Sequence, residues 1–141
     1  MSKTNIEQLM RGLAENQLSD GTTLSVDMFD GDNAVLCIKV QDRDEFPIYM
    51  TVDDSQILCI SYLFGEDQVD PGKRAEMNEA MLMMNVSIPL SAFSKIANQY
   101  IMFGALSPQS SIEEILNEIE LLSDNVLEAV DAISGYLKEA A

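Results

Sequence analysis

The chain has 141 residues, of which 47% are hydrophobic and 23% are charged, a balance typical of one globular domain with its own core. Its 24 acidic residues outnumber eight basic ones, which gives a formal net charge of -16 at pH 7. Binding to nucleic acid or to an anionic membrane surface depends on clustered cations, and only Lys73 and Arg74 are adjacent in this chain. The charge therefore excludes those two classes and is compatible with either simple solubility or a basic partner protein.

The sequence indicates a cytoplasmic protein with reduced thiols. Its first residues lead directly into a polar, amphipathic segment, and no apolar run approaches the ~20 residues that span a bilayer. The two cysteines, Cys37 and Cys59, lie in apolar segments typical of strands. Such cysteines are more often buried free thiols than partners in a disulfide framework.

The first half of the chain predicts one helix followed by four strands. Apolar residues recur at helical spacing from Ile6 to Leu13. Strand patterns then cover four segments, residues 24–28, 34–40, 46–52 and 57–64. The connections between them are short and polar, which favours an antiparallel meander, because parallel neighbours need long crossovers.

The second half begins with a helix predicted from Asp70 to about Met84. Asp70 is a suitable N-cap, and Pro71 suits the first helical position. Residues 86–90 then resemble a short edge strand, since Pro89 cannot donate a hydrogen bond to a ladder. A further strand is predicted from Tyr100 to Leu106.

The last helix is predicted over about residues 111–138, because apolar positions form one continuous helical stripe there. Ser111 and Glu114 have the spacing of a capping box at its start. The complete order is α-β-β-β-β-α-β-β-α. It predicts a single α+β domain over residues 1–141, in which an antiparallel sheet is flanked by helices.

One segment resembles a known family. Residues 77–85 (MNEAMLMMN), followed by Ile88 to Phe93, are similar to the helix-to-strand segment of the YjfI family of uncharacterised bacterial proteins. The order of elements resembles the type III secretion chaperone-like fold, which secretion chaperones share with YbjN-like proteins. The resemblance implies no catalytic residues. It does imply a partner, a phage-shock-protein-A-like membrane-stress protein.

The residue inventory argues against catalysis. Histidine is absent, which removes Ser-His-Asp and Cys-His sites, and two distant cysteines cannot form a structural zinc site. Residues 30–33 begin like a calcium loop, but the twelfth position is Gln41 instead of glutamate, so a hairpin turn explains them better. We therefore expect no catalytic, cofactor-binding or metal-binding residues. An enzyme that uses carboxylates and a divalent cation is the disfavoured alternative.

Two apolar surfaces are candidates for protein contacts. Met81 and Met84 belong to a methionine-rich helical face, which suits either a core or an adaptable binding surface. Val130, Ile133 and Leu137 lie near the end of the last helix. At ~1.5 Å per residue that helix outreaches a six-stranded sheet, so it either overhangs the sheet or breaks near Asn125. The sequence thus predicts a non-enzymatic protein-interaction module, or an adaptor of a phage-shock-protein-A-like system, with a homodimer as one form of association.

Overall fold

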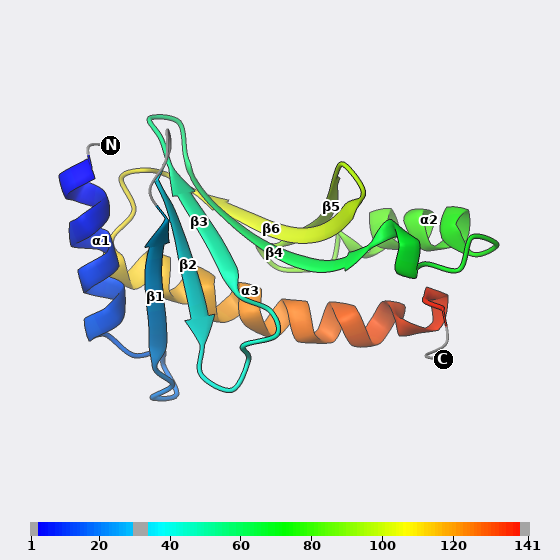
Figure 1. Cartoon of the computed structure of the whole chain (residues 1–141), viewed down its shortest axis with the longest axis horizontal. Coiled ribbons are helices and arrows are strands. Elements are labelled where there is room, and N and C mark those ends of the chain that lie inside the picture. Colours follow the sequence, from blue (N-terminus) through cyan, green and yellow to red (C-terminus); the bar gives the residue numbers. More distant parts are fainter. Residues whose placement is uncertain (1–2, 30–33, 139–141) are drawn as a thin grey trace.

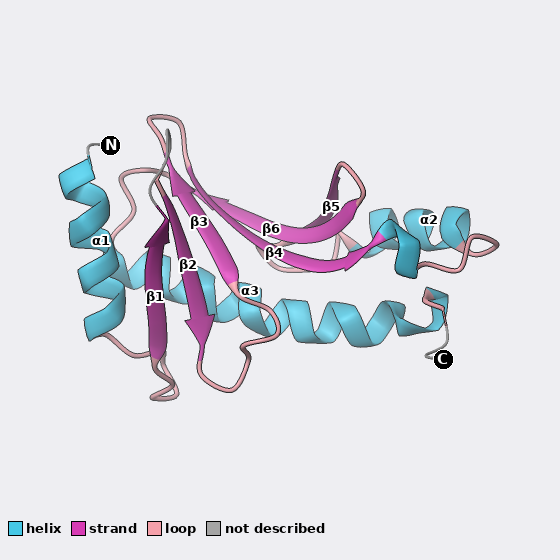
Figure 2. Cartoon of the chain, viewed as in Figure 1, coloured by secondary structure: helices cyan, strands magenta, loops and turns pink. Residues whose placement is uncertain are grey.

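The elements follow one another in the predicted order (Figures 1 and 2). The computed structural model describes residues 3–29 and 34–138. Its helices and strands are α1 (Lys3–Glu15), β1 (Leu24–Phe29), β2 (Val35–Val40), β3 (Ile48–Val52), β4 (Ile57–Gly65), α2 (Arg74–Met84), β5 (Ala92–Ile96), β6 (Gln99–Leu106) and α3 (Ile112–Ile133). Short 3-10 helices cover Glu66–Gln68 and Ser134–Tyr136. The prediction of an α+β fold is confirmed.

The six strands form one antiparallel sheet in the order β1-β2-β3-β4-β6-β5. Side chains alternate between its two faces, so that Ile38 and Val40 of β2 are buried and Lys39 between them is exposed. Figure 1 shows α3 running along one face of the sheet towards α2, while α1 lies beside β1. The core fills the space between α3 and this face, with Ile119 and Leu122 fully buried.

Helix α3 begins as predicted and ends earlier than predicted. The Ser111 hydroxyl accepts a hydrogen bond from the Glu114 amide (3.2 Å), and the Glu114 carboxylate accepts one from the Ser111 amide (3.1 Å). The helix then runs without a break through Asn125 to Ile133, so the alternative of two shorter helices is wrong.

Residues 136–138, just beyond α3, bond to the β4–α2 connection. The amide of Asp70 donates to the Tyr136 carbonyl (3.0 Å), and the amide of Lys138 donates to the Gln68 carbonyl (2.8 Å). Leu137 forms an isolated antiparallel bridge with Val69. The segment that was expected to overhang the sheet therefore contacts residues 68–70 of the same chain.

Two predicted boundaries are wrong for local physical reasons. Residues 86–90 form turns instead of a strand, because Pro89 lacks an amide proton and Leu90 adopts a left-handed conformation with φ 62. Helix α2 begins at Arg74 because Asp70 caps a turn, in which its Oδ1 accepts from the Gly72 amide (3.0 Å). The turn predicted at residues 30–33 lies outside the described residues.

Both cysteines are free and buried, as predicted. Burial, together with the charge of Glu118, raises the pKa of Cys59 to about 12. No helix in the described part of the chain is long and apolar enough to cross a membrane.

Candidate protein-binding surface

Exposed apolar side chains gather at the end of α2 and just beyond it. Leu82, Met83, Val86 and Leu90 are 70%, 71%, 91% and 68% exposed, the highest values for large apolar side chains among residues 3–29 and 34–138. Leu82 and Val86 are four residues apart and Met83 and Val86 three apart, spacings that place side chains side by side on a helical path. We refer to these four residues as the α2 patch.

A groove lies beside the patch, between α2 and β5. Its volume is about 300 Å³, and its lining consists of Asn78, Met81, Leu82, Asn85, Phe93, Ser94, Lys95 and Tyr100. Met81, Phe93 and Tyr100 are buried, whereas Leu82 is exposed. The groove therefore has an apolar base and continues into the α2 patch through Leu82.

Asn78 of α2 and Asn85 at its C-cap hold the two sides of the groove together. The hydroxyl of Tyr100 donates to Oδ1 of Asn78 (3.0 Å). The amide side chain of Asn85 bonds both backbone groups of Phe93, accepting from its N–H (2.7 Å) and donating to its carbonyl (3.3 Å). Asn85 thus occupies the free edge of β5 as a neighbouring strand would. These contacts give a physical role to residues 77–93, the segment that resembles the YjfI family.

The basic side chains next to the groove are already paired. Glu66 forms ion pairs with Lys95 (2.6 Å) and with Arg74 (2.5 Å). The Lys95 ammonium also lies 5.1 Å from the centre of the Tyr100 ring. The hydrogen bond from Lys95 lowers the pKa of the Glu66 carboxyl, so Glu66 stays ionised at neutral pH. A ligand in this groove would meet mainly apolar surface.

The α2–β5 loop, residues 85–91, rests on α3. Asn125 donates from its side chain to the Pro89 carbonyl and to the Ser91 hydroxyl, both at 3.0 Å. A second cavity of about 230 Å³ lies between this loop and α3 and includes Met84 and Ala129 in its lining. The loop is thus held from α3 while it exposes Leu90.

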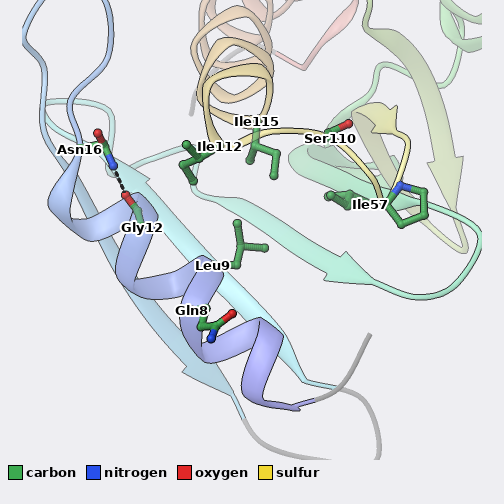
Figure 3. Close-up of a pocket in the computed structure, with 9 residues that line it drawn as sticks. Gln8, Leu9, Gly12, Asn16, Ile57, Ser110, Ile112 and Ile115 are labelled. Carbon is green, nitrogen blue, oxygen red and sulfur yellow. Dashed lines mark hydrogen bonds between the residues drawn. The ribbon is translucent and has the colours of Figure 1, made fainter.

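Another pocket, of about 340 Å³, lies between α1 and the start of α3 (Figure 3). Leu9, Ile57, Ile112 and Ile115 form its apolar wall, and the Asn16 side chain donates to the Gly12 carbonyl at its rim (2.5 Å). Its lining includes no acidic or basic side chain, and the Ser110 hydroxyl has no base beside it in that lining. Its apolar wall suits a hydrophobic contact.

The described residues contain no cluster of three or more His, Cys, Asp or Glu side chains that could hold a metal ion. The segment that resembles a calcium loop, residues 30–33, lies outside them. Glu118 of α3 is the most unusual carboxylate, because it is 3% exposed and its Oε1 has no hydrogen-bond partner. Burial raises the pKa of its carboxyl. Sequence analysis missed Glu118, although its place between Ile115 and Leu122 in the apolar stripe was a signal.

The five residues predicted as contacts lie in the core or against it. Ile133 is fully buried and Met81 is 5% exposed, while Val130, Leu137 and Met84 are partly buried and pack on the core. The structure brings Met81 and Met84 to the two cavities beside β5, and leaves the other three at the far end of α3. Sequence analysis missed the α2 patch. The signal was the run MLMM at residues 81–84, since a helix packed on one side cannot bury four successive side chains.

Comparison with known proteins gives the family. Residues 3–137 match the family described as "Uncharacterized protein conserved in bacteria (DUF2170)". The chain belongs to this family. It is 29% identical over 116 residues to the uncharacterized protein YjfI of Escherichia coli K12, and equally to that of Escherichia coli O157:H7, over 79% of this chain and 85% of each relative. The resemblance to YjfI is therefore confirmed.

The crystal structure of YbjN from E. coli is similar in fold. It matches with a TM-score of 0.64 and 15% identity over 99% of this chain and 97% of that chain. At this identity the likeness establishes a YbjN-like fold and no more. Neither the family nor these relatives carry a description that names an enzymatic activity.

Proposed function

We propose that this protein is a non-enzymatic binding module that holds a partner protein on the α2 patch and the adjoining groove. The α2 patch carries the proposal. Large apolar side chains exposed close together in one region of a protein often mark a site of association with another molecule. Methionine and leucine side chains at such a site adapt their shape to different partners.

The backbone at Leu90 supports the same function. A left-handed conformation costs a residue with a β-carbon roughly 1–2 kcal/mol, and glycine is the usual choice there. Leu90 adopts φ 62 and is nevertheless 68% exposed. Neither its conformation nor its burial stabilises the fold, so a role for its side chain in binding gives a reason for its presence.

The partner that fits best presents an apolar helical face with basic flanks. An amphipathic helix can lay its apolar stripe in a groove of this kind, and basic flanks would be attracted by the net charge of -16. A coiled coil of a phage-shock-protein-A-like protein, the partner that the family resemblance implies, would offer such a helix. A second copy of this chain is disfavoured by like charge.

A capture experiment tests the proposal. The wild-type protein and a double variant, Leu82→Ser with Val86→Ser, are immobilised and exposed to extract from the cells that make the protein. Leu127→Ser is the matched control, because Leu127 is 39% exposed on α3 and lies outside the patch. We expect a defined protein to bind the wild type and the control, and not the double variant, while all three melt alike. Equal capture by the double variant would disprove the proposed surface.

A further inference from the structure

Two oxygen atoms lie close to Gly104 of β6. A methyl group at position 104 would lie 1.8 Å from Oε1 of Glu118 and 3.1 Å from the Leu90 carbonyl oxygen. Oε1 of Glu118 has no hydrogen-bond partner. The carboxyl of α3 and the loop residue Leu90 therefore meet at the same glycine, in a buried place.

The same helix binds the loop on either side of Leu90. Asn125, seven residues after Glu118 and so on the same face of α3, donates to the Pro89 carbonyl and to the Ser91 hydroxyl. Residues 89–91 thus rest on α3 through Asn125, while Glu118 faces the residue between those two contacts. The state of the Glu118 carboxyl bears directly on whether the loop can remain there.

Within the described part of the chain, no ion pair joins Glu118 to a cation. The titratable group that faces it from β4 is the thiol of Cys59, which is neutral over the physiological range because its pKa is about 12. The loop residues 85–91 include no titratable side chain, and Tyr100, the only one on β6, bonds Asn78. On α3, Glu114 is engaged at the N-cap. An ionised carboxylate at this position would be buried, unpaired and close to a carbonyl oxygen of like polarity.

We propose that Glu118 is a proton-dependent restraint on the α2–β5 loop: the protonated side chain keeps residues 89–91 on α3, and the ionised side chain releases them. A protonated carboxyl carries an O–H group that can donate to the Leu90 carbonyl oxygen, whereas the carboxylate has acceptors only and repels that oxygen. Since Leu90 belongs to the α2 patch, the consequence for binding rests on the proposed function. The restraint itself does not depend on the proposed function.

The direction of the pH dependence follows from the burial of Glu118. Burial raises the pKa of Glu118 above its ordinary value of 4.5. The restraint is therefore complete below about pH 4.5, and it is lost as the pH rises through the raised pKa of the folded protein. Binding to the α2 patch should weaken over the same window, because the released loop no longer presents Leu90 in a fixed position.

Hydrogen exchange of the free protein tests the restraint without any partner. The amides of Ser87 and Phe93 report on the loop, since they bond the Met84 carbonyl (3.0 Å) and Asn85 Oδ1 (2.7 Å). Wild type and Glu118→Gln are compared at each of several values between about pH 5 and about pH 8, so that intrinsic exchange rates cancel. We expect equal rates at the acidic end. At the alkaline end we expect exchange at least several-fold faster in the wild type.

Glu128→Gln is the matched control, because Glu128 is exposed on the same helix and lines the second cavity beside the loop. It should exchange like the wild type throughout. Identical exchange in wild type and Glu118→Gln at every pH would overturn the restraint, even if the α2 patch binds its partner. Conversely, a failed capture experiment with the patch variants would refute the binding site and leave the exchange result standing.

Discussion

At the scale of single residues, Gly104 has no room for a side chain. Because a β-carbon there would overlap Oε1 of Glu118 and touch the Leu90 carbonyl, we expect Gly104→Ala to destabilise the fold by about 1–3 kcal/mol, the usual cost of overpacking. Urea unfolding measures the change. Gly135→Ala is the control, since nothing lies within 4 Å of a β-carbon at that position. It should leave the unfolding midpoint nearly unchanged.

A double variant shows whether the overlap with Glu118 is the cause. Glu118→Ala removes the nearer atom, so Gly104→Ala should destabilise a Glu118→Ala background less than it destabilises the wild type. Equal losses in both backgrounds would assign the cost to the Leu90 carbonyl instead, and would contradict a close contact between Glu118 and residue 104.

The thiol of Cys59 should be inert in the folded protein. It is fully buried, and with a pKa of about 12 only about one thiol in 10⁴ is ionised at pH 8. Because the thiolate is the reactive form, we expect alkylation to be slow in buffer and rapid in denaturant, as followed by mass spectrometry. Fast labelling of Cys59 without denaturant would contradict the structure around it.

At the scale of elements, sequence patterns correctly predicted features that depend on residues close together in the chain. The capping box of α3 depends on residues three apart, and the sequence shows it directly. A strand was predicted at 86–90 because Val86, Ile88 and Leu90 alternate with other residues as in a strand. The segment is instead a loop, held by hydrogen bonds from Asn125, which lies more than thirty residues away in the sequence. The real edge strand, β5, has a weak pattern in the sequence, because Phe93 is its only buried residue.

Asn85 should therefore be important for stability. Asn85→Ala leaves the backbone N–H and carbonyl of Phe93 without partners, and each partly buried group left unsatisfied costs ~1–3 kcal/mol. We expect a lower melting temperature and faster hydrogen exchange at the Phe93 amide. Asn117→Ala, at an exposed position of α3, is the matched control and should not destabilise the protein. Similar melting of Asn85→Ala and wild type would show that water replaces the side chain at no cost.

At the scale of the whole molecule, the sequence predicted the fold class and left the partners of the last two strands undetermined. An antiparallel meander follows from short connections, and β1 to β4 obey it. The hairpin of β5 and β6 could join β4 by either strand, and the sheet places β6 there. Burial of Tyr100 and Met102 on the face towards α3 gives the physical reason, because β6 carries more apolar residues than β5 and so takes the inner place.

The net charge leads to a prediction for stability in salt. With -16 formal charges on 141 residues, repulsion among carboxylates opposes the compact state. The ion pairs in the structure, such as Arg43 with Asp124 (2.7 Å) and Glu66 with Lys95, are at least partly exposed and contribute little. Raising sodium chloride from about 20 mM to about 300 mM shortens the screening length to below about 8 Å. We expect the added screening to weaken the repulsion among carboxylates more than it weakens the attraction within the ion pairs.

The melting temperature should therefore rise with salt. For a chain of this size, about 1 kcal/mol of relieved repulsion corresponds to roughly 4 °C. Circular dichroism melting at the two salt concentrations measures the shift. Lys39→Glu, at an exposed position on β2, makes the net charge more negative and should melt lower than wild type in low salt, with the gap narrowing in high salt. A melting temperature that falls as salt is added would mean that the ion pairs around Glu66 and Arg43 outweigh the repulsion of the acidic surface.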